Sequence, residues 1–422
     1  MNRNKGKLFE DGFLNQIRER FAYVESDPVS GKRIYLENAG GSLTLKKVVK
    51  VVADQTGFPD NAGRNNRTSA EINKLISKGK EDVMTLLGAR SGIVVMGEST
   101  TANAFKILSS IIGYVPGDNV VTTNLDHPAI FDSTRILGER FNKEWRVAEL
   151  SPESAIVKPE SILRYIDSKT IVLALIHSSN ITGTRNNVEN IIQKAKKIKS
   201  DLFVLVDGAQ HAQHSLIDVE ELGCDVYLIS SYKTFSKIGA SFMYLSDRAA
   251  YLPHDKLLGK PETCWELGTR EQAGYAAWSV VIDYLCWLGS HFAESQLRRE
   301  QIVAAMEAIE LHERALTHRI LKGTEKLKGL SEMDGVTVYT AVDDLALREP
   351  IIMFNVKGMK SGEVVSYLGQ KGIRVHNRIS DAYSRHTLKA LGVEECVRVS
   401  LAHYNTPEEV DTFLRTLAPV TK

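Results

Sequence analysis

The stretch VYLISSYKTFSKIGA, residues 226–240, opens on four apolar residues and then changes to two serines, a tyrosine and a lysine, Lys233. A short apolar run without polar alternation is typical of a strand that is buried on both faces of a parallel sheet. In such sheets, ligands gather beyond the carboxyl ends of the strands. The stretch therefore indicates an α/β fold and raises the question of what a lysine does where a buried strand ends.

Further apolar runs of this kind occur between about residues 70 and 250, separated by helical patterns. The predicted strands are 92–97, 119–124, 170–177, 202–208, 225–231 and 240–245. The helical patterns between them cover 102–112, 128–137 and 188–199. Apolar strands joined by helices predict a mostly parallel sheet, covered by helices on both faces and wound with right-handed crossovers.

The rest of the chain has a different character. Helical spacing extends over 7–23 and 271–329, and short strands are expected at 33–38 and, between helices, throughout 337–422. The last region favours a smaller α/β domain built on an antiparallel sheet. A chain of 422 residues is long enough for one large and one smaller domain. The predicted division is an N-terminal helical segment, a large domain and a small C-terminal domain, over residues 1–30, 31–295 and 296–422.

The composition argues against several classes of function. Lysine and arginine, 53 together, almost balance 52 aspartates and glutamates, so we expect no nucleic-acid partner. The four cysteines form no CxxC pair, so we expect neither a metal site nor a disulfide framework. The start of the chain has no signal-peptide pattern, and no apolar run is long enough to cross a membrane. The expected location is the cytoplasm.

Lys233 and Asp207 each have two interpretations. Lys233 is either a solvated loop lysine or a partly desolvated amine that forms a Schiff base with pyridoxal phosphate (PLP). Asp207 either caps the turn after its strand or pairs with the pyridinium nitrogen of that cofactor. The interval between the two residues accommodates one helix and one strand, so we expect them on neighbouring strand ends.

Hydroxyl groups at two other strand ends suit a phosphate. Ser99 and Thr100 open a predicted helix, where free backbone N–H groups bind anions. The alternative is that these hydroxyls only cap the helix. Ser230 can add another hydroxyl.

Four more polar residues have a functional and a structural interpretation. His127 either lies flat on a cofactor ring or is a hydrogen-bonded rim residue, and Asn180 and Gln210 either donate to a phenolic oxygen or satisfy loop backbone. Arg398, in a late strand, is either solvated or faces a cleft in which it binds a substrate carboxylate bidentately.

Six segments of the chain together resemble fold-type I PLP-dependent enzymes of aminotransferase class V. They are GESTTAN (97–103), LDHPAI (125–130), 177–191, 206–233, WELGTR (265–270) and VRVSLAHYNT (397–406). The nearest branch is the cysteine desulfurase and selenocysteine lyase group, and the resemblance extends from about Tyr35 to about Leu417. It implies a large PLP-binding domain with a mostly parallel sheet of the seven-stranded type between helices, and a smaller C-terminal α/β domain.

The resemblance also implies site residues. The implied cofactor-binding set is Lys233, Asp207, Gln210, Asn180, His127, Ser99, Thr100, Ser230, Tyr232 and Thr269. Lys233 and His127 are the expected catalytic residues. Thr269 is expected to reach the cofactor of a neighbouring subunit, which implies a homodimer.

The expected substrate-binding residues come from four segments. Arg398, Asn38 and Ala39 follow from the resemblance. Arg67, in the Arg- and Asn-rich stretch 61–69, and His376, in the expected loop 376–386, are further candidates that can set the substrate. For Arg67 the alternative is a solvated loop charge.

Three departures from the family pattern bear on the activity. Residues 372–383 contain no cysteine, although desulfurases of this type carry their nucleophilic cysteine there, so no persulfide can form at that position. Tyr232 precedes the lysine where the family usually has His, and the usual Gly-Pro after the lysine is missing.

The expected function is a PLP-dependent lyase that expels a β-substituent, most simply sulfur, from an amino acid. The alternatives are an aminotransferase, an epimerase or a cyclising enzyme on the same scaffold, and a non-catalytic binding protein.

Overall fold

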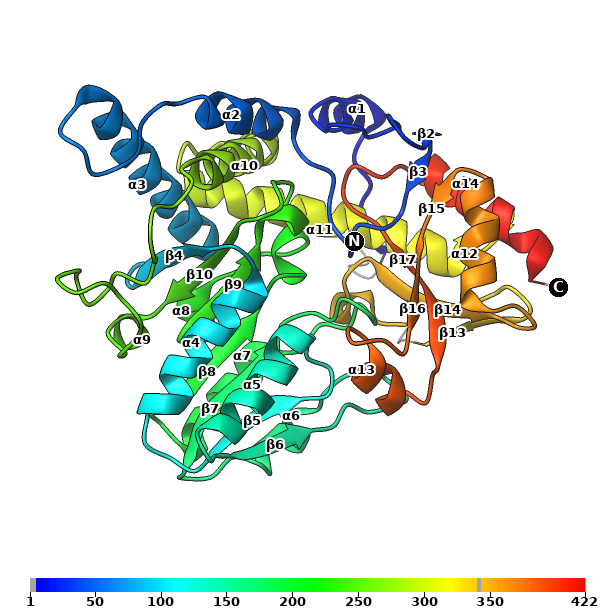
Figure 1. The fold of residues 1–422 in the computed structure, drawn as a ribbon. Coiled ribbons are helices and arrows are strands. Elements are labelled where there is room, and N and C mark those ends of the chain that lie inside the picture. Colours follow the sequence, from blue (N-terminus) through cyan, green and yellow to red (C-terminus); the bar gives the residue numbers. More distant parts are fainter. Residues whose placement is uncertain (1–4, 340–342, 422) are drawn as a thin grey trace.

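The computed structural model describes residues 5–339 and 343–421, and its centre is a seven-stranded sheet (Figure 1). The strand order is β4-β10-β9-β8-β7-β5-β6. Their bounds are β4 Ile93–Gly97, β5 Asn119–Thr123, β6 Glu144–Ala148, β7 Thr170–Ile176, β8 Phe203–Asp207, β9 Val226–Ser230 and β10 Ser241–Leu245. The neighbours from β9 to β6 are parallel, whereas β10 is antiparallel to both β4 and β9. The mostly parallel sheet is confirmed.

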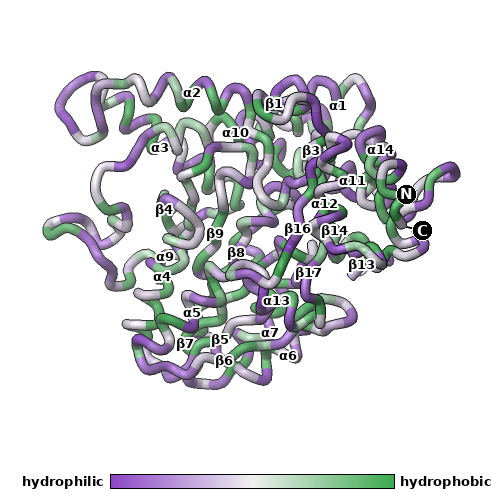
Figure 2. The backbone as a smooth tube through the Cα atoms, turned by 45° about the vertical axis from the view of Figure 1, so that its right-hand side comes forward, coloured by the Kyte–Doolittle hydropathy of each residue, from purple (hydrophilic) through white to green (hydrophobic). Residues whose placement is uncertain are grey.

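Both faces of this sheet are covered by helices. Along β8, Val204 and Val206 pack in the same core as Ile191 of α7 (Val188–Ile198) and Trp278 of α10 (Ala273–Gly289). The alternate residue Leu205 packs on the other face, with the helices α4 (Thr100–Tyr114) and α5 (Pro128–Arg140). Figure 2 shows the hydrophobic residues along the interior strands, while the loop between α2 and α3 is largely hydrophilic. Burial on both faces explains why the strands are apolar without alternation.

Shorter elements surround the large sheet. The helices are α1 Asp11–Arg18, α2 Lys46–Thr56, α3 Arg67–Leu87, α6 Pro159–Leu163, α8 Val219–Leu222 and α9 Asp247–Ala250, and the 3₁₀ turns include η2 His211–Gln213 and η3 Ser231–Lys233. The small strands β1 (Ser26–Asp27) and β2 (Gly31–Lys32) form a hairpin, and β3 (Ile34–Tyr35) pairs in parallel with β15 (Ile373–Arg374). None of the described helices has the length and apolar character needed to cross a bilayer.

The C-terminal region forms a four-stranded antiparallel sheet in the order β13-β14-β17-β16, as expected. Its strands are β13 Val336–Val338, β14 Ile351–Val356, β16 His376–Ile379 and β17 Glu395–Ser400, and its helices are α12 Ser361–Gln370, α13 Arg385–Ala390 and α14 Pro407–Leu417. A short ladder, β11 Gly323–Thr324 with β12 Leu327–Lys328, and the turns η4 Leu345–Leu347 and η5 Ala418–Val420 complete it. Residues 376–379 were expected as part of a loop; this expectation was wrong, because they pair with β17.

One long helix joins the two sheets. Helix α11 (Arg298–Lys322) contributes Ile302 and Ile309 to the core of the large sheet, and Leu316 and Ile320 to the core of the small sheet. Figure 1 shows α11 crossing behind the molecule from one side to the other. The boundary between the predicted domains stays a prediction, since this helix belongs to both cores.

Candidate active site

A single cavity lies at the carboxyl ends of the parallel strands, between the two sheets. Twelve residues line it: Ser99, Thr100, Thr101, His127, Ile176, Asn180, Asp207, Ala209, Gln210, Ser230, Tyr232 and Lys233. This set contains the whole predicted cofactor-binding group except Thr269, and it adds Thr101, Ile176 and Ala209. The sheet therefore brings together polar residues that lie far apart in the sequence.

Lys233 ends the 3₁₀ turn η3, directly after β9, and its side chain is buried. No hydrogen bond or ion pair holds its Nζ among the described residues, and Nζ lies 5.9 Å from the centre of the Tyr232 ring. Burial lowers the pKa of Lys233 to about 8, although the charge of Asp207 opposes this shift. A larger fraction of this amine is therefore neutral near pH 8 than of a solvated lysine.

Asp207 is the last residue of β8 and is also buried. Its Oδ1 accepts a hydrogen bond from the backbone N–H of Ala209 at 3.0 Å. Burial raises the pKa of Asp207, while that hydrogen bond and the Lys233 charge lower it. The following Gly208 has no room for a side chain, because a Cβ there would lie 2.2 Å from the Tyr227 ring. The backbone at Asp207 is thus packed tightly against the next strand.

The start of α4 is capped by its own hydroxyl group and also faces the cavity; phosphate binding there stays a prediction. Ser99 caps the helix, since its hydroxyl accepts from the N–H of Ala102 at 3.1 Å. Thr100 exchanges a hydrogen bond with the hydroxyl of Ser241 on β10 at 3.1 Å. Both residues also line the cavity, so the first turn of this helix faces it.

Gln210 is held by a buried network that the sequence did not reveal. Its Nε2 lies 3.4 Å from Nε2 of His214, and Nδ1 of His214 lies 2.8 Å from Oε2 of Glu313 on α11. The Oε1 of Gln210 is buried, and no described residue forms a hydrogen bond with it. An unpaired buried acceptor beside the cavity is free to bind a donor placed there.

His127 is the N-cap of α5, with Nδ1 accepting from the N–H of Ala129 at 3.1 Å. Burial and the nearby charges of Lys233 and Arg378 lower the pKa of His127 to about 3. The imidazole is therefore neutral near pH 7. It can lie against a flat group in the cavity, but it does not supply a positive charge.

Arg398 lies on β17 of the small sheet and is almost fully buried. Its Nη1 donates to the carbonyl oxygen of Asn180, on the large domain, at 2.7 Å. Within residues 5–339 and 343–421 no carboxylate lies within the 4.0 Å ion-pair distance of Arg398, and its Nε has no partner. Burial lowers the pKa of Arg398 to about 9, so the guanidinium keeps its charge near pH 7. Arg398 therefore faces the gap between the domains, and the solvated alternative does not apply.

The turn at Asn38 and Ala39 is held in place by hydrogen bonds to other parts of the protein. Asn38 donates from Nδ2 to the carbonyl of Ser400 at 2.8 Å and accepts from the Tyr404 hydroxyl. The N–H of Ala39 donates to the Ser400 hydroxyl at 2.9 Å. The Asn38 side chain is thus engaged inside the protein, and its predicted substrate contact remains a prediction.

The other predicted residues lie outside the cavity lining. His376 lies on β16, opposite Arg398, and its Nδ1 is 3.3 Å from Oε1 of Glu37. Arg67 is the exposed first residue of α3, and its neighbour Asn66 caps that helix and donates to Asp60. Thr269 is exposed. Nothing in the single chain brings Arg67 or Thr269 to the cavity.

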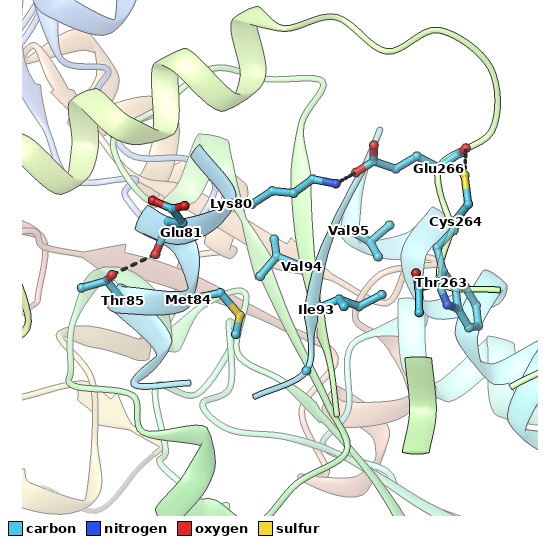
Figure 3. A pocket seen from close by; sticks show the side chains of 12 residues that line it. Lys80, Glu81, Met84, Thr85, Ile93, Val94, Val95, Thr263, Cys264 and Glu266 are labelled. Atoms are coloured by element: carbon cyan, nitrogen blue, oxygen red, sulfur yellow. Dashed lines mark hydrogen bonds and ion pairs between the residues drawn. The ribbon is translucent and has the colours of Figure 1, made fainter. Parts of the chain in front are cut away.

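A second cavity, of about 590 Å³, lies beside the edge strand β4 (Figure 3). Lys80 of α3 pairs with Glu266 across it at 3.3 Å, and the Cys264 thiol contacts the Glu266 carbonyl. It contains none of the predicted site residues. Lys80 and Glu266, two of its three charged residues, are paired with each other, and the predicted site residues lie in the first cavity.

The comparisons with known proteins agree with this geometry. The profile of the family "Aminotransferase class-V" matches residues 34–413. An aminotransferase-like protein of Gibberella zeae is 28% identical over 96% of this chain and 98% of its own length. A probable cysteine desulfurase of Borreliella burgdorferi is 26% identical over 96% of this chain and 97% of its own length.

Solved structures share the fold. A cysteine desulfurase from Thermococcus onnurineus superposes with a TM-score of 0.78 at 23% identity, over 94% of this chain and 97% of that one. One from Escherichia coli gives 0.77 at 20% identity, over 98% and 99% of the two chains. The chain belongs to the aminotransferase class-V family, with cysteine desulfurase-like relatives, and this family is typically PLP-dependent.

Proposed function

We propose that the protein is a PLP-dependent enzyme that acts on an amino acid. The observation that carries the proposal is the pair Lys233 and Asp207, a buried amine and a buried carboxylate that line one cavity from neighbouring strand ends. The unpaired Oε1 of Gln210 can accept from a phenolic O–H of this cofactor, and the α4 N-terminus at Ser99 and Thr100 fits its phosphate. Asp207 suits the ring nitrogen.

When bound, PLP supplies an electron sink for negative charge at the substrate α-carbon. The protein residues then have separate tasks. Lys233, whose pKa is about 8, is placed to accept the α-proton and to return a proton later. The neutral His127 ring limits the freedom of a flat group beside it, and Arg398 orients the substrate by its α-carboxylate.

For the reaction we propose elimination of a β-substituent, most simply sulfur. Lys233 takes the Cα proton, the Cβ–S bond breaks, and the sulfur leaves as a thiol after it gains a proton. Water then completes the release of pyruvate and ammonia. No step requires a persulfide on the protein.

The cysteines support this choice over a desulfurase that uses a thiolate. None of the four, all of them in the described part of the chain, lines the cavity. Cys396 is the one on the Arg398 strand, and it is completely buried. Burial raises the pKa of Cys396 to about 12, so its thiol stays protonated near pH 7.

An aminotransferase is the second candidate, because the same residues serve it and one relative is described as aminotransferase-like. The two activities separate in a half-reaction without keto acid. A transaminase leaves the cofactor as its stable amine, which a keto acid reverses, whereas a lyase releases pyruvate and a thiol. A non-catalytic binding protein gives neither result.

The proposal includes a homodimer in which Thr269 reaches the partner's site. Thr269 lies in the segment between α9 and α10, which extends away from the body in Figure 1. Leu258 and Leu267 of this segment and Ile238 are exposed apolar residues. Exposed apolar residues are compatible with burial in a subunit interface.

The deciding experiment adds PLP to the purified protein, follows the visible absorption band, and reduces the complex with borohydride. Peptide mass spectrometry should then find the cofactor on Lys233, and the Lys233→Ala variant should give no band. A cofactor fixed on another lysine, or no band with the unaltered protein, would overturn the proposal. A panel of cysteine, cystine and cysteine conjugates then tests for pyruvate and thiol.

A further inference from the structure

Two arginines and a histidine share one face of the small sheet. In the register of β16 and β17, His376 is opposite Arg398 and Arg378 is opposite Cys396. Opposite partners in a ladder, and residues two apart on a strand, point to the same side of the sheet. Arg378 therefore lies on the face that carries Arg398, the face that meets Asn180 of the large domain. Asn377 points the other way, toward Gly362 of α12.

The charges on this face are not balanced. Two carboxylates lie near this face, Glu37 and Asp381. Glu37 is already paired with Arg374 at 2.7 Å and with His376 at 3.3 Å, and Asp381 accepts from the backbone N–H of Tyr383 at 2.9 Å. In the residues that the structure describes, no carboxylate is within 4.0 Å of Arg378 or Arg398. Both guanidinium groups also have a buried Nε without a partner. Two arginines that make no ion pair within the described residues place positive charge at the domain junction, and an anionic ligand can balance it.

Arg378 is not part of the lining of the Lys233 cavity but lies close to it, on the side of His127. Its Nη2 donates to the carbonyl of Tyr383 at 3.4 Å, and the Tyr383 ring centre lies 6.2 Å from that of His127. The segment after β16 is anchored over this region, since His386 bonds to the carbonyl of Asp126 at 2.7 Å. The charge of Arg378 lowers the pKa of both His127 and Lys233, as expected for a neighbour.

We infer that the site takes an amino acid with a second anionic group, with Arg398 binding the α-carboxylate and Arg378 the anion at the end of the side chain. The inference rests on the proposed function and adds a substrate class to it: cysteine conjugates or related amino acids with a terminal carboxylate or similar acid. The Arg398 guanidinium donates to the Asn180 carbonyl and that of Arg378 to the Tyr383 carbonyl, so different segments orient the two groups, as suits two anionic groups.

A matched pair of ligands tests this. S-carboxymethyl-L-cysteine and S-carbamoylmethyl-L-cysteine have the same size and differ in one negative charge. Each is titrated into the PLP-loaded protein, and binding is read from the change in the visible band. We expect the acid to bind about 10- to 100-fold more tightly than the amide, the effect of one charge-assisted hydrogen bond.

Two variants assign the preference to Arg378. Arg378→Gln should lose the preference and leave the affinity for the amide nearly unchanged, and Arg378→Lys should keep part of it. Arg385→Gln, which removes an exposed positive charge nearby on α13, is the matched control and should behave as the unaltered protein. Thermal unfolding and the intensity of the band show that each variant is folded and loaded.

The possible failures are distinct. If the unaltered protein forms no band with PLP, the proposed function fails and this inference fails with it. If the band forms but the two ligands bind equally, the inference alone fails. If Arg378→Gln weakens both ligands alike, Arg378 serves the α-carboxylate or the fold, which also overturns the inference.

Discussion

At the scale of single residues, the state of the Lys233 amine decides how readily the protein combines with PLP. Only the neutral amine attacks an aldehyde, and with a pKa of about 8 roughly half of the Lys233 side chains are neutral at pH 8. We predict that the rate at which the visible band appears rises with pH, with a midpoint near 8. Stopped-flow absorbance between pH 6.5 and 9.5 measures this. A midpoint near 10 would show a solvated lysine.

Asp207 gives a second prediction at this scale. Its negative charge raises the pKa of Lys233, so Asp207→Asn should move the midpoint of that pH profile to lower pH. The same variant should weaken PLP binding by about 10- to 100-fold, because a buried charge-assisted hydrogen bond to the ring is lost. Asp201→Asn, at an exposed position, is the control. An unchanged midpoint would mean that the charge of Asp207 does not act on Lys233.

The residues that line the cavity were largely predictable because each follows a predicted strand, and the ends of parallel strands meet at one edge of a sheet. The residues that hold these side chains in position could not be predicted from the sequence. Glu313 reaches His214, and through it Gln210, from a helix far along the chain. Neither residue carries a local signal, because the contact depends on how α11 packs.

At the scale of elements, two helical glycines make a matched prediction. Gly79 of α3 packs against α10, and a Cβ there would lie 2.7 Å from Cβ and 2.9 Å from the carbonyl oxygen of Tyr275. Gly369 of α12 has no heavy atom within 4 Å of that position. We expect Gly79→Ala to lower the free energy of unfolding by about 1–3 kcal/mol through overpacking. Gly369→Ala should raise it by up to about 1 kcal/mol, because alanine favours the helix.

Urea unfolding followed by circular dichroism measures both changes. The paired design matters, since alanine gains the same helix propensity at both positions and only the contact with Tyr275 differs. Equal stabilisation by the two substitutions would show that α3 and α10 can separate without cost, contrary to the packing described above.

The elements also show where the sequence was insufficient. Strand β6 (Glu144–Ala148) was not predicted, because it lies at the edge of the sheet, where its residues are only partly buried and mix charged with apolar types. Strand β16 was also not predicted, because its residues are mostly polar and line the domain junction. The reversal of β10 was not predicted either. Only residues 231–240 separate it from β9, too few for the crossover that a parallel pair needs.

At the scale of the whole molecule, the site exists because the chain folds back on itself. Helix α11 crosses from the core of the large sheet to that of the small one, and this return places Arg398 against Asn180. From the sequence, Arg398 could either be solvated or face the cleft, and only the packing of the two sheets decides between these directions. Whether a second subunit contributes to the site depends on how two chains assemble, and an experiment on mixed subunits can decide this question.

If Thr269 serves the partner's site, two defective variants should repair each other. In a mixed dimer of Lys233→Ala and Thr269→Val subunits, the site on the Thr269→Val subunit has its own Lys233 and receives Thr269 from its neighbour. One site of the two is then complete. We predict that each variant alone binds PLP poorly or not at all, with a loss of about tenfold for Thr269→Val as one phosphate hydrogen bond disappears.

After subunit exchange, equal amounts of the two variants should recover tight sites amounting to about one quarter of all sites, because half of the dimers are mixed at random and each holds one complete site. Titration with PLP, read by the visible band, counts these sites, and sedimentation confirms the dimer. Mixing two samples of the same variant is the control. Absence of recovery in a proven mixed dimer would mean that Thr269 acts within its own chain or has no part in the site.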